Sequence, residues 1–164
     1  MKKVRRSDKV QTQESGIVQA AKIYRYCAYQ ERSHREVKNK LFEYGLRPGE
    51  VDEIMAHLIT EGFLNEERYA KAFAGGKFRM MKWGRLKIKH QLEFEGVSAR
   101  NITRGLAEIS DADYAKTLRQ LIKKRSVSST EKDIFRKKNQ LARFVIGKGF
   151  EPELVWEAVS DFLT

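Results

Sequence analysis

Residues 37–58, VKNKLFEYGLRPGEVDEIMAHL, decide the fold, because their pattern returns twice further along the chain. Residues 88–109, IKHQLEFEGVSARNITRGLAEI, align with them when Gly96 is placed on Gly45, a shift of 51 residues. A third copy surrounds Gly149, 53 residues after Gly96. A fixed period of this length is typical of helical repeats that stack on one another. Six apolar positions recur with the glycine: Val37, Leu41, Leu46, Val51, Met55 and Leu58, then Ile88, Leu92, Val97, Ile102, Leu106 and Ile109, then Leu141, Val145, Phe150, Val155, Val159 and Phe162.

Helix start and stop signals flank these copies. Ser33 followed by Glu36 forms a capping box, and Ser128 followed by Glu131 forms a second one, which should open the long helix before Gly149. Glycine just after an apolar helical stripe favours a left-handed helix end, so positive φ angles are expected at Gly45, Gly96 and Gly149. No stretch of β-branched residues alternates with period two. The sequence therefore predicts about nine helices and no strand.

An upstream helix also recurs, since Ala-Lys appears at 21–22, 70–71 and 115–116. Each unit is then one helix, a second helix that ends in glycine, a short turn and a third helix. We predict an all-α fold of three tandem three-helix repeats in an elongated or curved, right-to-left helical array. The predicted division is a basic flexible arm over 1–16 and repeats over 17–62, 63–109 and 110–164.

Composition limits the class of protein. The 164 residues carry a formal charge of +11, and 41% of them are hydrophobic. One cysteine, Cys27, excludes a disulfide framework and a four-cysteine zinc site. No apolar stretch approaches the roughly 18–20 residues of a membrane span. We expect a cytoplasmic monomer that uses no metal or cofactor, does not contact a membrane and binds an anionic partner.

The basic charge is segregated. Residues 68–92 hold eight Lys and Arg and no acidic residue, and residues 116–143 have a net charge of +8. Helical spacing predicts that Lys82, Arg85 and Lys89 share one face, and a similar spacing relates Lys132, Arg136 and Arg143. The candidate contacts to DNA or to an acidic protein are Arg68, Lys71, Lys77, Arg79, Lys82, Trp83, Arg85, Lys87, Lys89, Lys116, Arg119, Lys123, Lys132, Arg136 and Arg143.

Two alternatives stay open for these residues. The charged faces could be merely solvated, although like charges in clusters repel, so that an alternating pattern would serve solubility better. Phe78 and Trp83 could stack on unpaired bases or pack in the core, whereas the i, i+4 spacing of Tyr69 and Phe73 favours the core.

No catalytic motif is found. Gly75-Gly76-Lys77 lacks the Ser or Thr and the first glycine of a phosphate loop, and it lies in helical context. The three histidines have no metal-ligand spacing with one another or with Cys27, which is expected to be a buried small hydrophobe. We predict that the protein is not an enzyme and has no catalytic residues.

One segment resembles a known family. Residues 62–70, GFLNEERYA, resemble the G-[YF]-[LI]-[DN]-[DE]-E-R-[YF]-A signature of the RecX regulatory proteins. Residues 83–88, WGRLKI, with Leu92 and residues 95–97, EGV, are similar to the stretch that follows in the family, and Lys148-Gly149-Phe150 resembles its C-terminal pattern. Asn65 stands where Asp is commoner, and Gly75-Gly76 replaces better helix formers. The resemblance covers roughly residues 17–163.

The resemblance implies a function. RecX proteins bind the RecA recombinase, chiefly its filament on single-stranded DNA, and inhibit its recombinase, ATPase and co-protease activities. This would place the protein in the regulation of homologous recombination, DNA repair and the SOS response. One alternative is a stand-alone helical nucleic-acid-binding protein, since three-helix units resemble helix-turn-helix modules. The other is a hydrolytic or transfer enzyme whose site no sequence motif reveals.

Overall fold

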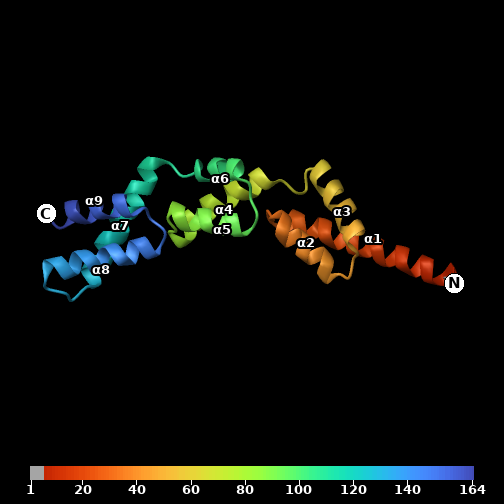
Figure 1. Cartoon of the computed structure of the whole chain (residues 1–164), viewed down its shortest axis with the longest axis horizontal. Helices are drawn as coiled ribbons and strands as arrows, with labels where there is room; N and C mark the ends of the chain where they lie inside the picture. Colours follow the sequence, from red (N-terminus) through yellow and green to blue (C-terminus); the bar gives the residue numbers. More distant parts are fainter. Residues whose placement is uncertain (1–5) are drawn as a thin grey trace. The chain divides into compact units, whose positions relative to one another are not determined.

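The computed structural model describes residues 6–164, with side chains from Gly16 onward except residue 17, and this part of the chain consists of helices joined by short connections (Figure 1). This part of the chain contains no strand, which confirms the predicted all-α fold of nine helices in tandem three-helix units. The helices are α1 (Arg6–Tyr29), α2 (His34–Glu43), α3 (Pro48–Thr60), α4 (Glu66–Met81), α5 (Arg85–Phe94), α6 (Ala99–Leu106), α7 (Asp111–Ser128), α8 (Ile134–Gly147) and α9 (Pro152–Phe162).

The chain divides into two compact units, which we call the N-terminal unit (Met1–Tyr69) and the C-terminal unit (Ala70–Thr164). The first helix is longer than the sequence suggests. Helix α1 begins at Arg6, so residues 6–16 of the predicted flexible arm are helical. Residues 1–5 of that arm lie outside the described residues.

The middle helix of each repeat ends in the same way. Gly45, Gly96 and Gly149 have φ angles of +82°, +77° and +99°, as the aligned glycines predict. Glycine carries no Cβ, so it adopts this left-handed conformation at little steric cost. The residue after each glycine then donates its N–H to a carbonyl five residues earlier, which closes a Schellman motif. These bonds join Leu46 to Leu41 at 3.4 Å, Val97 to Leu92 at 3.0 Å and Phe150 to Val145 at 3.3 Å.

One predicted cap is confirmed and another is wrong. The Ser33 hydroxyl accepts the N–H of Glu36 at 3.0 Å and caps α2. Ser128, in contrast, is the last residue of α7, and the N-cap of α8 is Asp133, whose carboxylate accepts the N–H of Arg136 at 2.8 Å. Serine and aspartate cap helices about equally well, and the negative charge of aspartate also favours the positive end of the helix dipole.

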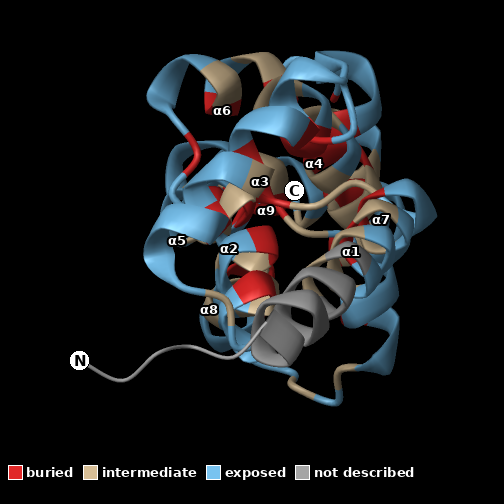
Figure 2. Cartoon of the chain, turned by 90° about the vertical axis from the view of Figure 1, so that its right-hand side faces the viewer, coloured by how far each residue is buried: buried red, intermediate tan, exposed pale blue. Residues whose placement is uncertain are grey.

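The recurring apolar positions form the cores of both units, and the buried residues of α2 and α4 appear as red segments in Figure 2. Five of the six positions are buried in each repeat. The remaining position is half-buried in the first two repeats, at Leu46 and Leu106, and exposed in the third, at Phe162. Ile88 and Leu92 are fully buried in the C-terminal unit, as are Val37 and Leu41 in the N-terminal unit.

Two glycines bring the second and third repeats together inside the C-terminal unit. The N–H of Gly84 donates to the carbonyl of Lys148 at 2.7 Å, and the N–H of Leu86 donates to the carbonyl of Gly149 at 2.9 Å. A Cβ on Gly84 would lie 2.2 Å from the carbonyl carbon of Gly149, so only glycine fits there. We call this contact the glycine crossing.

Candidate functional site

The first candidate, Arg68, forms an ion pair and a hydrogen bond within the N-terminal unit. Its Nε atom lies 2.5 Å from a carboxylate oxygen of Glu31, and its Nη2 atom donates to the carbonyl of Gly62 at 2.9 Å. Glu31 therefore neutralises this guanidinium, which holds the start of α4 against the N-terminal unit. Lys71 follows almost one turn later on α4 and is half-buried.

The two aromatic candidates differ. Phe78 is buried and stacks on Tyr114 with ring centroids 5.9 Å apart, so it belongs to the core. Trp83 is half-buried, and the ammonium groups of Lys77 and Lys87 lie 5.0 Å and 4.6 Å from its ring centroid. Such cation–π contacts contribute about 0.5–1 kcal/mol each at exposed sites. Two predicted lysines and the predicted tryptophan therefore form one cluster.

The face predicted for Lys82, Arg85 and Lys89 is wrong. Lys82 lies between α4 and α5 with a φ angle of +57°, and its ammonium donates to the carbonyl of Arg79 at 2.9 Å. A residue outside the helix cannot follow its i, i+3, i+7 spacing. The Arg79 guanidinium in turn packs over Gly75, where a Cβ would lie 2.8 Å from it. Lys89 remains exposed, with Glu93 3.9 Å from its ammonium.

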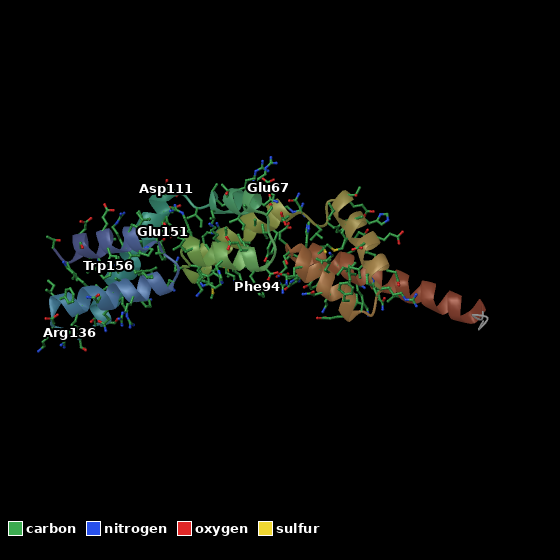
Figure 3. The ribbon with its side chains drawn as sticks, in the orientation of Figure 1. Glu67, Phe94, Asp111, Arg136, Glu151 and Trp156 are labelled. Carbon is green, nitrogen blue, oxygen red and sulfur yellow. The ribbon has the colours of Figure 1, made fainter. Side chains whose placement is uncertain are left out.

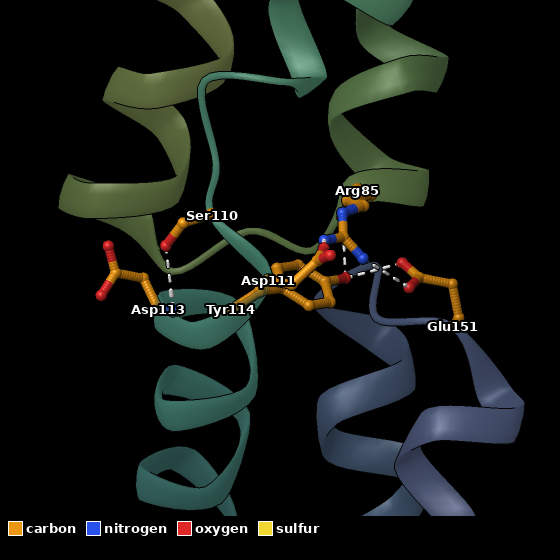
Figure 4. A network of polar contacts seen from close by, with 6 residues as sticks. All are labelled: Arg85, Ser110, Asp111, Asp113, Tyr114 and Glu151. Atoms are coloured by element: carbon orange, nitrogen blue, oxygen red, sulfur yellow. Dashed lines mark hydrogen bonds and ion pairs between the residues drawn. The ribbon is translucent and has the colours of Figure 1, made fainter.

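Arg85 is the centre of a polar network that joins α5, α7 and the N-cap of α9 (Figure 4). Its guanidinium lies 2.6 Å from a carboxylate oxygen of Asp111 and 3.4 Å from one of Glu151. Its backbone N–H donates to the Tyr114 hydroxyl at 3.0 Å, and that hydroxyl donates to Glu151 at 2.6 Å. The guanidinium also lies 3.9 Å from the centroid of the Tyr114 ring. Arg85 therefore connects the second and third repeats instead of presenting a free charge.

The electrostatics of Tyr114 keep this network intact at neutral pH. Burial raises the pKa of the Tyr114 hydroxyl well above its usual value, and the hydrogen bond to Glu151 raises it further. The hydroxyl therefore stays protonated and donates to the carboxylate while it accepts from Arg85. Because the Tyr114 hydroxyl both donates and accepts a hydrogen bond, the network holds the side chains around it in fixed positions.

A second basic surface lies on α7 and α8. Seven residues line a hollow of about 600 Å³, and we call it the arginine hollow. Arg136, labelled in Figure 3 near the start of α8, and Arg143 are the two predicted residues in it. Lys132 lies between α7 and α8, so the helical spacing predicted for it is wrong. The lining residues are Arg125, Phe135, Arg136, Asn139, Gln140, Arg143 and Phe144.

Sequence reasoning missed five residues of this hollow, which are Arg125, Phe135, Asn139, Gln140 and Phe144. Asn139 and Gln140 lie between Arg136 and Arg143 at helical spacing, and that signal could have found them. Phe135 gave no signal, because a phenylalanine near an apolar stripe is expected to be buried, yet 73% of it is exposed. The remaining candidates, Lys116, Arg119 and Lys123, are exposed along α7.

A separate groove runs between α7 and α9. It has a volume of about 570 Å³, and Leu118, Ile122 and Leu154 line its apolar floor. Asp111 and Arg119 lie at its margin, so its charge is mixed. This groove differs from the arginine hollow, whose lining has no acidic residue.

Cys27 and the histidines do not assemble a metal site. Cys27 is buried in the N-terminal unit, and burial raises the pKa of its thiol. His34 is half-buried, whereas His57 and His90 are exposed. Over the described residues, no three side chains of the metal-binding types gather, and no helix there is long and apolar enough to cross a membrane.

Comparison with known proteins finds similarity to RecX regulatory proteins. The family model for RecX, second three-helix domain, matches residues 65–106, which contain α4, α5 and α6. This part of the chain is therefore similar to the second three-helix domain of RecX proteins. A RecX regulatory protein of Clostridium perfringens is 29% identical over 122 residues, covering 73% of this chain and 57% of that protein. One of Prosthecochloris aestuarii is 24% identical over 139 residues, covering 85% of this chain and 89% of that protein.

Solved RecX structures share the fold. RecX from Lactobacillus salivarius superposes with a TM-score of 0.81 at 20% identity, covering 90% of this chain and 96% of that one. A second RecX structure gives a TM-score of 0.81 at 18% identity over 97% of this chain. The chain spans 51–61% of the length of the RecX proteins it matches from clostridia and Halalkalibacterium halodurans.

Proposed function

We propose that this chain is a RecX-family regulator that binds the RecA recombinase filament on single-stranded DNA and inhibits its recombinase, ATPase and co-protease activities. The observation that carries the proposal is the RecX-type second domain within an array of three-helix units. In this proposal the protein acts in the cytoplasm as a monomer and needs no catalytic group, because occupying a surface of the filament is sufficient for inhibition.

The charge distribution supports an anionic partner. Residues 116–143 carry a net charge of +8, and Lys116, Arg119 and Lys123 are exposed on α7. A DNA–protein filament presents phosphates over its length, and clustered basic groups speed association with such a partner. Arg68 and Arg85 contribute less to this surface, because carboxylates inside the protein already pair with them.

An ATPase assay tests the proposal. The full chain should slow ATP hydrolysis by the cognate RecA on single-stranded DNA at substoichiometric amounts. A control variant, Lys22→Gln with Arg25→Gln and Lys38→Gln, removes three exposed charges outside the candidate residues and should inhibit as the wild type does. An unchanged ATPase rate at equimolar wild-type protein would refute the regulatory role.

The arginine hollow also suits a stand-alone nucleic-acid-binding protein, because its charge and its exposed ring need no recombinase. Binding to bare DNA separates the two functions. Strong dependence on base sequence, without any effect on RecA, would favour the stand-alone protein over the filament regulator.

A further inference from the structure

The arginine hollow combines charge, concavity and an aromatic ring in one place. Arg136, Gln140 and Arg143 lie on one face of α8 at i, i+4 and i+7, and Arg125 joins them from the last turn of α7. A hollow of about 600 Å³ is within the usual size range of small-ligand sites and can accommodate a nucleotide.

The charge in the hollow is not compensated by its own lining. All three of its arginines are exposed, and no acidic side chain lines the hollow. The guanidinium of Arg125 lies 4.8 Å from the ring centroid of Phe144, which anchors that arginine at the edge of the hollow. Guanidinium groups that line the same hollow repel one another, and a phosphate backbone would relieve the repulsion.

The polar side chains and Phe135 add features that a simple charged patch lacks. The Gln140 carbonyl oxygen accepts from the Ser129 hydroxyl at 2.6 Å, so the amide nitrogen of Gln140 is the group left to donate to a ligand. Asn139 donates to the carbonyl of Phe135 at 2.9 Å, which fixes that amide beside the ring. The Phe135 ring is 73% exposed and contributes little to the core.

We propose that the arginine hollow is a binding site for single-stranded DNA, in which arginines contact phosphates and an unpaired base stacks on Phe135. An exposed aromatic ring beside basic groups is the usual arrangement for binding unpaired strands. Bases in a duplex already stack on one another and would leave the ring unused. An acidic peptide would use the charge but would not need the ring. The inference rests on the proposed function, since it assigns the DNA contact of that function to the third repeat.

Fluorescence anisotropy of an oligothymidylate of about 20 nucleotides tests the site with the full chain. Phe135→Ala should weaken binding about fivefold or more, because it removes a stacked base. The matched control is Ile134→Ala, at a neighbouring position with 59% exposure, which should bind as the wild type does. Phe135→Trp should retain binding. Equal effects of the two alanine variants would overturn the role of the ring.

Replacing Arg125, Arg136 and Arg143 by Gln tests the charge. This variant should flatten the log–log salt dependence of binding by about 2, because each phosphate contact on a single strand contributes roughly 0.7. The control variant at Lys22, Arg25 and Lys38 loses the same charge and should keep the wild-type slope. Similar slopes for both variants would overturn the site and leave only diffuse attraction.

Competition and the ATPase assay separate the remaining outcomes. The wild type and Phe135→Ala could have the same DNA affinity, and polyglutamate could displace the oligonucleotide equally from both. That result would indicate an acidic protein as the ligand and would overturn the DNA site. Wild-type protein that inhibits RecA but does not bind the oligonucleotide would also overturn the site and leave the proposed function standing. Binding that follows the expected pattern without RecA inhibition would uphold the site and refute the filament regulator.

Discussion

Gly149→Ala should destabilise the C-terminal unit far more than Gly96→Ala, although both glycines end equivalent helices. Each substitution forces an alanine into a left-handed conformation, at a cost of about 1–2 kcal/mol. At Gly96 no atom outside its chain neighbours lies within 4 Å of the added Cβ, so the cost stops there. At Gly149 the Cβ would lie 2.3 Å from the Cβ of Lys87 and 2.7 Å from its backbone nitrogen.

Relief of that clash requires the glycine crossing to separate. Separation breaks the bonds from Gly84 and Leu86, each of which contributes about 0.5–1.5 kcal/mol. With the conformational cost, Gly149→Ala should lose about 2–5 kcal/mol. Urea melts followed by tryptophan fluorescence suit the measurement, because Trp83 and Trp156 both lie in the C-terminal unit. If the two variants lose equal free energy within about 0.5 kcal/mol, the crossing contributes no stability and our reasoning is refuted.

Three further perturbations test the network and the buried thiol. Arg85→Gln should lower the free energy of unfolding by about 1–3 kcal/mol, because it leaves the carboxylates of Asp111 and Glu151 without their cation, whereas Lys89→Gln in the same urea melts should change it by less than about 0.5 kcal/mol. The pKa of Tyr114 is higher in the folded chain than in the unfolded chain, so the unfolded chain releases the hydroxyl proton at lower pH. The stabilisation from this proton is therefore complete below pH ~10 and falls as the pH rises further. Tyr114→Phe should lack this loss of stability at alkaline pH, and equal losses in the variant and the wild type would contradict the assignment. Cys27 should react with iodoacetamide at least about tenfold more slowly in the native chain than in urea, and equal rates would show that the thiol is accessible.

The sequence predicts the repeat architecture well, because its signals are local. A glycine after an apolar stripe and a serine before one act within a few residues, and Ser33 caps the helix expected of it. The start of α8 is harder to predict, because Ser128 and Asp133 are both competent caps.

The candidate site is less predictable, because the ion pairs of a charged side chain depend on residues that are distant in the sequence. Arg85 pairs with Asp111 and Glu151, which lie 26 and 66 residues away in the chain. Helical spacing therefore identified the basic residues but could not tell which of them the fold neutralises. The same reason hides Phe135, whose exposure depends on the course of the connection between α7 and α8.

The glycine crossing also has a kinetic consequence. Each Schellman motif closes over five residues, whereas the bond from Gly84 to Lys148 spans 64. Short loops close faster than long ones, so the helical hairpins should form first and the third repeat should dock late. The amides of Gly84 and Leu86 then become reporters of that last step. In native-state hydrogen exchange they should open together, at a lower free energy than the amides in the middle of α5, whenever the third repeat undocks without unwinding its helices.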